Sequence, residues 1–256
     1  MKKFKAFTLI ELIIVMAIMA ILMAAIMQMM KPIRATFVDT TYYEAQRTTQ
    51  SGMVEYLSET LRYADNAGIY TKGVTSNGKT INNVTDAITL FKAEVKNPDG
   101  SELTNDQINV ITIDNTTKYK YGNKNCYGRL VRSKPPASGN YTVNAEKPNT
   151  SEGRLALGSA YYGENNYSIN VVKDASANDV HITISSIIAT SLPAENAANV
   201  VKTEDITSNK KHVLTEGYVV CQNLDISKKF FTDHAGATTT KQGVNTYIVF
   251  TLPKAD

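Results

Sequence analysis

A long apolar run near the N-terminus constrains this chain more than any other feature. It extends from Phe7 to Met30. Only Thr8, Glu11 and Gln28 interrupt it. As an α-helix rising 1.5 Å per residue the run would be about 36 Å long, more than the roughly 30 Å hydrocarbon core of a bilayer. Ile, Leu, Met and Ala dominate it, without Gly or Pro, so we predict a membrane-spanning helix that is apolar on all sides.

The charges beside this run predict its orientation. Three lysines, Lys2, Lys3 and Lys5, precede it. Because basic residues stay on the cytoplasmic side of a membrane, we expect everything after Lys31 to lie outside. A secretory signal peptide is disfavoured, since its apolar core has about 7–15 residues and ends at a small-residue cleavage site. A plain single-pass anchor is the simplest alternative.

Glu11 is the one charged residue inside the run. A carboxylate at the bilayer centre costs roughly 2.5–3.5 kcal/mol on insertion scales, so an acid in such a helix is a functional-site hypothesis. However, Glu11 lies only about 6 Å along a helix from Phe7, close enough for its side chain to reach the interface. The glutamate alone therefore indicates a function without defining it.

The charge balance argues against a nucleic-acid partner. The chain has 27 Lys and Arg against 24 Asp and Glu, and three of the lysines belong to the N-terminal leader. The remainder is therefore neutral, and no run of basic residues builds a positive patch. A neutral surface lacks the field that attracts phosphates, so we expect no nucleic-acid binding.

The helical pattern continues beyond the apolar run with a polar face. Apolar residues recur at three- and four-residue steps between Ile33 and Ala64. Asn66 and Gly68 then indicate the end of the helix. We predict a single helix of about 60 residues, membrane-spanning in its first half and amphipathic over residues 31–67.

The remaining residues, 68–256, indicate mostly strands. Asn77-Gly78 predicts a hairpin turn, Asn97–Gly100 predicts another turn, and the apolar spacing between them predicts a short helix over Val84–Val95. Alternating runs rich in β-branched and aromatic residues predict further strands at Ile108–Ile113, Tyr167–Val172, Val180–Ile187, Tyr218–Gln222 and Tyr247–Leu252.

The expected fold class is α+β. The long N-terminal helix should pack on an antiparallel β-sheet head and fill one of its faces. The composition of Ser133–Gly153 predicts a long surface loop. Thr232–Asn245 is expected to form the loop of a wide hairpin.

No catalytic, cofactor or metal signature is present in the sequence. His181, His212 and His234 are scattered without the spacing of metal ligands. There is no P-loop, no GxSxG and no dinucleotide fingerprint. We therefore expect no enzyme, no cofactor and no metal.

Two cysteines, Cys126 and Cys221, follow the apolar run. A disulfide between them would close a long loop, worth about 4.7 kcal/mol in the chain-entropy model. Two thiols buried as small apolar groups are an equal alternative. Tyr161, Tyr162 and Tyr167 form an aromatic group that would suit an adhesive patch, but the tendency of tyrosines to be partly buried favours core packing.

The residues around Glu11 carry a specific motif. The stretch KAFTLIEL, residues 5–12, resembles the type IV prepilin cleavage and methylation signal, usually a small residue followed by FTLIEL. The resemblance covers about the first 30 residues. It implies that a prepilin peptidase cleaves between Ala6 and Phe7 on the cytoplasmic face and N-methylates Phe7. It also implies that the new α-amine pairs with Glu11 of a neighbouring subunit, which would make a buried charge tolerable.

Two positions depart from the pattern of that family. Glycine usually precedes the cleaved bond, whereas this chain has Ala6. Many members carry a proline where this chain has Gln28, and the nearest proline here is Pro32. Pro32 would remove the hydrogen bond to the Gln28 carbonyl and bend the helix there.

The resemblance implies a structural subunit of a type IV pilus-like filament in a bacterium: a pilin, a minor pilin or a pseudopilin. Residues 1–6 would be the leader, 7–30 the transmembrane and filament-core helix, 31–67 its amphipathic continuation and 68–256 the head. The implied partners are other pilin subunits, the prepilin peptidase and the cytoplasmic membrane, before the subunit joins a cell-surface filament. The alternative is a monomeric, membrane-anchored extracellular binding protein or adhesin.

Overall fold

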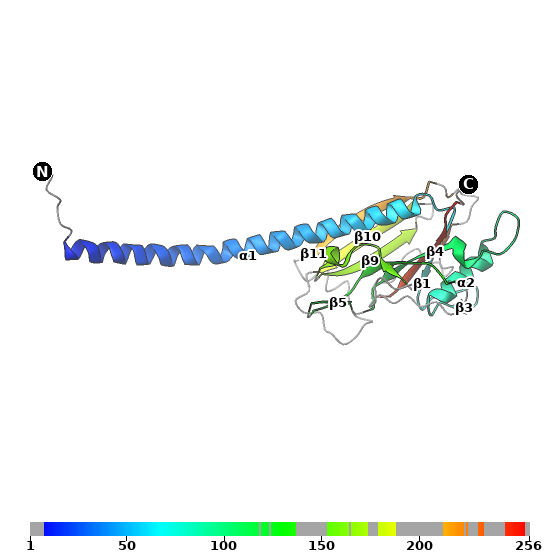
Figure 1. Ribbon diagram of the computed structural model, residues 1–256, viewed down its shortest axis with the longest axis horizontal. Coiled ribbons are helices and arrows are strands. Elements are labelled where there is room, and N and C mark those ends of the chain that lie inside the picture. Colours follow the sequence, from blue (N-terminus) through cyan, green and yellow to red (C-terminus); the bar gives the residue numbers. More distant parts are fainter. Residues whose placement is uncertain are drawn as a thin grey trace. The chain divides into compact units, whose positions relative to one another are not determined.

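The computed structural model describes residues 8–117, 119–122, 124–136, 153–163, 165–173, 179–187, 212–222, 224, 230–232 and 244–253. The helices are α1 (Leu9–Leu61), α2 (Val84–Glu94), a 3-10 turn (Asn105–Gln107) and α3 (Ser159–Tyr162). The strands are β1 (Asn66–Thr71), β2 (Thr75–Ser76), β3 (Lys79–Thr80), β4 (Ile108–Asp114), β5 (Tyr119–Tyr121), β6 (Lys124–Cys126), β7 (Arg129–Ser133), β8 (Arg154–Leu155), β9 (Asn166–Lys173), β10 (Asp179–Ile187), β11 (His212–Val220), β12 (Phe230–Thr232) and β13 (Thr246–Thr251). Figure 1 labels most of them. The chain divides into two units, Met1–Glu44 and Ala45–Asp256.

The first unit contains the N-terminal part of α1. Its large apolar side chains are exposed throughout, from Leu9 at 80% to Phe37 at 74%. The helix continues through Pro32 without interruption. The Thr36 hydroxyl donates a hydrogen bond to the Pro32 carbonyl at 3.0 Å, the local bonding that threonines make inside helices. The predicted long helix is thus present, although it begins and ends inside the predicted limits.

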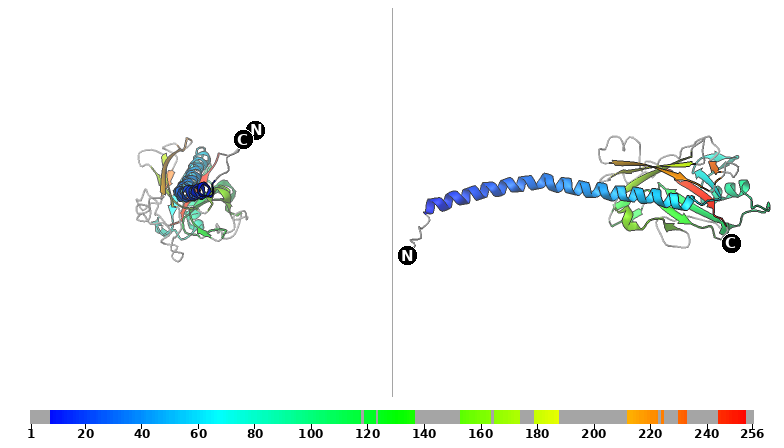
Figure 2. Two further views of the ribbon diagram at one scale, coloured as in Figure 1. Left: turned by 90° about the vertical axis from the view of Figure 1, so that its left-hand side faces the viewer. Right: turned by 90° about the horizontal axis from the view of Figure 1, so that it is seen from above.

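The second unit is built on two sheets. A six-stranded sheet has the order β12-β1-β13-β4-β7-β8, and a three-stranded sheet has the order β11-β10-β9. Neighbouring strands are antiparallel, except that β12 runs parallel to β1. The last strand of the chain, β13, lies inside the larger sheet between β1 and β4, and is red in Figure 2.

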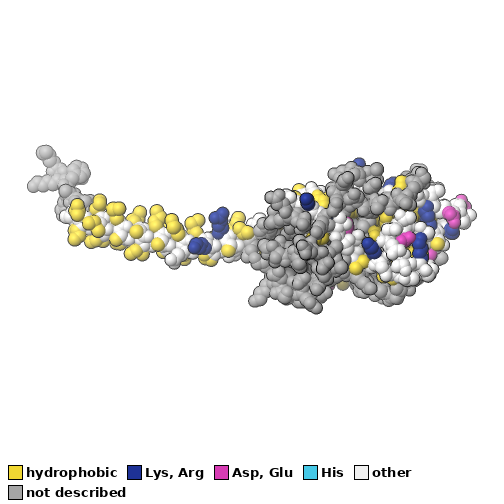
Figure 3. Space-filling model, turned by 90° about the horizontal axis from the view of Figure 1, so that it is seen from below, with side chains coloured by type: hydrophobic (Ala, Val, Ile, Leu, Met, Phe, Trp, Pro, Cys, Tyr) yellow, Lys and Arg dark blue, Asp and Glu magenta, His cyan; other side chains and the backbone are white. Residues whose placement is uncertain are grey.

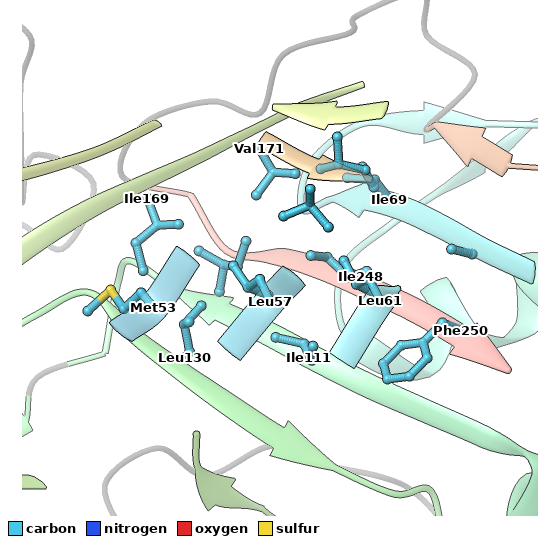
Figure 4. Close-up of a cluster of buried hydrophobic side chains, with 14 of the residues drawn as sticks. Met53, Leu57, Leu61, Ile69, Ile111, Leu130, Ile169, Val171, Ile248 and Phe250 are labelled. Carbon is cyan, nitrogen blue, oxygen red and sulfur yellow. The ribbon is translucent and has the colours of Figure 1, made fainter. Parts of the chain in front are cut away.

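The last turns of α1 lie between these two sheets. Met53, Leu57 and Leu61 come from successive turns and are at most 1% exposed (Figure 4). The buried side chains around them come from both sheets: Ile69, Ile111, Leu130, Ile248 and Phe250 from the larger one, and Ile169, Val171, Val180 and Val219 from the smaller one. The α+β class with an antiparallel sheet is confirmed, and the helix is covered on two sides rather than one.

A second cluster covers the opposite face of the larger sheet. Val84, Ile88 and Phe91 of α2 pack there with Val110 of β4, whereas Ile111, the next residue of β4, belongs to the cluster around α1. Every residue of β4 is buried. Strand β4 is therefore buried on both faces, and its neighbouring apolar residues Val110 and Ile111 belong to different clusters.

Helix α1 ends earlier than the predicted stop at Asn66 and Gly68. Its last residue is Leu61, and Asn66 and Gly68 lie in β1. The Asp65 N–H donates to the Thr251 carbonyl at 2.9 Å, and β1 then pairs with β13 along its whole length. Strand pairing draws this segment out of the helix although Ala64 continues the helical spacing. The boundary prediction was therefore wrong by several residues.

Most local predictions in the head are confirmed. Asn77 and Gly78 join β2 to β3 with positive φ values of 47° and 77°, as a two-residue hairpin turn requires. The Gly100 N–H bonds to the Asn97 carbonyl at 2.8 Å, which closes the second turn. The predicted short helix is α2, and four of the five predicted strands agree with β4, β9, β10 and β13 within about a residue. The fifth, Tyr218–Gln222, overlaps only the last three residues of the longer β11, which ends at Val220.

One predicted connection is wrong. Strands β12 and β13 do not form a hairpin around Thr232–Asn245, because β1 lies between them in the sheet. Phe230 of β12 and Phe250 of β13 both pair with Ala67 of β1, one on each side. Within Ser133–Gly153, which we predict as a loop, residues 137–152 lie outside the described residues.

Candidate site for anchoring and assembly

The exposed apolar surface of α1 is the most distinctive surface of the protein. Its most apolar 18-residue window has a mean hydropathy of 2.9, and none of that window is buried within the protein. Figure 3 shows the yellow side chains of this stretch. The exposure continues beyond Met30 to Ile33, Phe37 and Val38. By length and composition α1 is able to cross a membrane, and its surface needs a bilayer or other apolar helices to cover it.

Glu11 is held by the first turn of its own helix. Its Oε2 accepts hydrogen bonds from the Thr8 N–H and from the Thr8 hydroxyl, both at 2.9 Å. In return, the Glu11 N–H donates to the Thr8 hydroxyl oxygen at 3.4 Å. This is a capping box, in which Thr8 and Glu11 satisfy amide groups that the start of a helix leaves unpaired.

The capping box changes the interpretation of Glu11. The sequence suggested that its charge is answered by the α-amine of another subunit, but the carboxylate already has a partner within its own chain. That partner is adjacent in sequence to Phe7, whose nitrogen would become the new N-terminus. Ala6 and Phe7 themselves lie outside the described residues. The spacing Thr-x-x-Glu in the sequence is a sufficient signal for the capping box.

Lys31 and Arg34 follow the apolar run on the next turns of α1, and both are exposed. They mark the end of the apolar surface, because lysine and arginine place their charges in water or among lipid head groups while their stems lie along apolar surface. No charged residue lies between Glu11 and Lys31. The uncharged stretch between them is therefore flanked by a carboxylate on one side and by cations on the other.

Polar contacts hold α1 at the start of the second unit. Gln46 is fully buried and donates from Nε2 to Oδ1 of Asn165 at 3.1 Å. One turn later the Thr49 hydroxyl donates to the carbonyl of Tyr161 at 2.5 Å. The apolar contacts begin only at Met53.

A buried arginine lies beside these contacts. Arg129, at the start of β7, is 1% exposed. Its Nη1 donates to the carbonyls of Tyr127, Gly128 and Asn165 at 2.8, 3.0 and 3.2 Å. Its Nε and Nη2 have no hydrogen-bond partner among the described residues.

Three tyrosine rings surround that guanidinium. Its carbon lies 4.4 Å from the ring centre of Tyr162, 4.9 Å from that of Tyr119 and 6.0 Å from that of Tyr167. Burial lowers the pKa of Arg129 and raises that of Tyr162 to about 12. Tyr162 and Tyr167 are thus core residues, as favoured, while Tyr161 is 59% exposed. Nothing in the sequence near Arg129 indicates this cluster.

Cys126 and Cys221 are both buried as thiols. The N–H of Tyr127, the residue after Cys126, donates a hydrogen bond to Oδ1 of Asn166. Asn166 pairs with Ile187 at one end of β10. Cys221 follows Val220, which pairs with Asp179 at the other end of β10. The length of β10 separates the two ends by roughly 26 Å, far beyond the reach of a disulfide. The buried-thiol alternative therefore applies in this fold, and burial with nearby Asp179 raises the pKa of Cys221 to about 12.

The structure places the backbone of two of the three histidines. His181 and His212 lie on β10 and β11, and His234 is outside the described residues. No group of three or more His, Cys, Asp or Glu that could hold a metal ion occurs among the residues that the structure describes.

Comparison with known families identifies the N-terminal segment. Residues 1–27 match the family model described as the prokaryotic N-terminal methylation motif. This motif is the prepilin-type cleavage and methylation signal, and it includes Ala6, Phe7 and Glu11. No curated protein and no solved structure matches the chain.

Proposed function

Because residues 1–27 carry a prepilin-type signal, we propose that this protein is a structural subunit of a type IV pilus-like filament. A prepilin peptidase would remove residues 1–6 and methylate Phe7. The mature subunit would wait in the cytoplasmic membrane with its head outside, and then join a cell-surface filament through α1. Its role would be that of a pilin, a minor pilin or a pseudopilin, and we infer no catalytic activity.

One observation carries this proposal: the methylation motif continues directly into a helix whose large apolar side chains from Leu9 to Val38 are exposed. The head leaves residues 9–38 without apolar cover in the described structure. A bilayer would cover the stretch up to Met30. Ile33 and Phe37 lie beyond Lys31 and, at 66% and 74% exposed, need a different partner. Parallel helices of further copies would cover both regions at once.

We propose two roles for Glu11 that different substitutions separate. Its carboxylate caps the helix through Thr8, and after cleavage it would attract the charged α-amine of Phe7 in a neighbouring subunit. Glutamine at this position preserves the capping box, because its side-chain oxygen still accepts the Thr8 N–H, but it removes the charge. Alanine removes both.

The test expresses the full-length chain, Glu11→Gln and Glu11→Ala in cells that have a prepilin peptidase and its filament assembly machinery. We expect wild type in filaments sheared from the surface, with mass spectrometry showing methylated Phe7 at the N-terminus. Both variants should be cleaved and retained in the membrane. If Glu11→Gln assembles as wild type does, the capping role suffices and the ionic role is wrong.

The alternative function has a different outcome in the same experiment. A monomeric, membrane-anchored binding protein would remain in the cell membrane with an intact Met1 and would give no sheared filament. Both Glu11 variants would then behave like wild type. That result would overturn the filament proposal.

A further inference from the structure

Helix α1 carries a pair of cations in the first unit of the chain and a pair of anions in the second. Lys31 and Arg34 follow the apolar run, and Glu55 and Glu59 lie on the part of α1 that is embedded in the head. All four residues are exposed. Spacings of three and four residues place each pair on one face of the helix. The helix therefore presents a cationic pair and an anionic pair to its surroundings.

The two acids lie on a solvent-facing stripe of the embedded helix. Arg47, Ser51, Glu55, Glu59 and Arg62 are all exposed at three- and four-residue steps. Met53, Leu57 and Leu61 on the other side of the helix are buried between the two sheets. The stripe is therefore accessible to another molecule although the helix passes through the core of the head.

None of the four charges is paired within the described chain. The ion pairs among the described residues join Lys79 to Asp86 and Lys96 to Glu102. The side chains of Lys31, Arg34, Glu55 and Glu59 have no hydrogen bond or ion pair there. Both pairs belong to α1, which is helical from Leu9 to Leu61.

A single displacement between two parallel copies brings both pairs together. Lys31 precedes Glu55 by 24 residues, and Arg34 precedes Glu59 by 25. A shift of one copy by about 36 Å along the helix axis would therefore align both cations with both acids. Copies anchored in one membrane by the same segment enter it in the same orientation, so the parallel arrangement is the relevant one.

We propose that Lys31 and Arg34 of one copy pair with Glu55 and Glu59 of a second copy of this chain. This inference rests on the proposed filament and adds an axial register to it. Exposed ion pairs contribute little affinity singly. Their effect here is selective, because this displacement sets two acids opposite two cations, whereas Glu44 offers the cations a single acid at a shorter displacement. The apolar surface supplies the attraction, and the charges select the displacement.

Cysteine cross-linking in assembled filaments tests this register. Full-length Arg34→Cys and Glu59→Cys chains are produced together in assembling cells, so that a disulfide between these positions joins two copies. Each substitution leaves the pair Lys31 and Glu55 in place. We expect a cross-linked dimer after mild oxidation when both chains are present and none with either chain alone. Cys126 and Cys221 are buried and should not compete.

The matched control replaces Glu59→Cys by Arg47→Cys. Arg47 is exposed on the same stripe, but it lies only 13 residues after Arg34. The mixture of Arg34→Cys and Arg47→Cys chains should give at least about tenfold less cross-linked dimer, because two cysteines form a disulfide only when their Cα atoms lie within about 7 Å. Equal dimers in both mixtures, or dimers only in the control, would overturn the register. Filaments without either dimer would overturn it too, while the absence of filaments from wild type would overturn the proposed function itself.

Charge reversal gives a second readout that needs no new cysteine. One variant combines Lys31→Glu with Arg34→Glu, and another combines Glu55→Lys with Glu59→Lys. Like charges then face each other, and we expect each variant to lower filament yield by about tenfold. The chain with all four substitutions should recover the yield. Loss without recovery would contradict direct pairing, and unchanged yields in all variants would contradict any role for these charges.

Discussion

Among the residues that the structure describes, Arg129 is the largest side chain that is fully buried. A buried charge is tolerable only when the groups around it replace water. No carboxylate among the described residues pairs with it. Backbone carbonyls and the faces of tyrosine rings stabilise it instead. It thereby links β7 to the segment around α3 and to β9, close to the point where α1 enters the head.

Replacing Arg129 by lysine should destabilise the head although the charge is conserved. Lysine cannot present a planar group to three rings while donating to several carbonyls. We expect Arg129→Lys to lower the free energy of unfolding by about 2–4 kcal/mol, measured by urea denaturation of the full-length protein in detergent. Arg154→Lys, at an exposed arginine on the neighbouring strand, should change it by less than about 0.5 kcal/mol. Equal stability of both variants would mean that the cage around Arg129, formed by the backbone carbonyls and the three tyrosine rings, is not structurally important.

At the scale of elements, the start of α2 is fixed by side chains from the sequence immediately before it. Asn83 caps the helix by accepting the Asp86 N–H at 3.0 Å. Oδ2 of Asp86 accepts the Asn82 N–H at 3.0 Å, and Lys79 lies 3.1 Å from its other oxygen. These contacts are local in sequence, which explains why the position of α2 could be predicted.

The Asp86 contacts predict a pH dependence. Partial burial raises the pKa of Asp86, but the Asn82 N–H, the Lys79 ammonium and the Asn83 contact together hold it below its usual value. A carboxyl whose pKa is depressed by folding stabilises the protein above its unfolded pKa of about 3.9 and loses that contribution as the pH falls through the folded value. The stability difference between wild type and Asp86→Asn should therefore be constant above about pH 5 and shrink below pH ~3.9. Denaturation curves at several pH values measure it.

Lys79→Met is the control for this effect. It removes the ammonium but keeps the Asn82 N–H bond to Asp86. The decrease of stability at low pH should become smaller without disappearing. A difference between wild type and Asp86→Asn that does not change with pH would show that Asp86 has no depressed pKa.

At the scale of the whole molecule, α1 joins the two sheets into one folded unit. Met53, Leu57 and Leu61 contact residues of both sheets, so neither sheet has a complete core without the helix. Gly217 of β11 permits the smaller sheet to lie close to the helix, because a Cβ at this position would lie only 2.3 Å from a methyl group of Val54. The smaller sheet therefore approaches the helix as closely as the backbone allows.

Truncating one of these helix residues should weaken both sheets together. We expect Leu57→Ala to lower the free energy of unfolding by about 2–5 kcal/mol through lost burial and the cavity that remains. Hydrogen exchange should show reduced protection in β4 and β9 to a similar extent. Ile33→Ala, at an exposed position of the same helix, should leave both unchanged. Loss of protection in only one sheet would contradict a shared core.

Features that depend on neighbouring residues could be predicted before the structure was known. The apolar run, the motif around Glu11, the turns and α2 all follow from local patterns, and so did the α+β class. The capping box between Thr8 and Glu11 was not predicted, although its Thr-x-x-Glu spacing is a local signal of the same kind. Each of these features is stabilised mainly by contacts within a few residues or, for the apolar run, by apolar surroundings such as a bilayer.

The meeting of distant segments could not be predicted and is known from the folded structure alone. The end of α1 at Leu61 depends on the pairing of β1 with β13, nearly two hundred residues later. The cage around Arg129 and the separation of Cys126 from Cys221 depend on strand order, which no local pattern specifies. Burial of α1 by a second sheet has the same origin. Such contacts gain their energy from surfaces that touch only after the chain has folded, so single-sequence patterns do not record them.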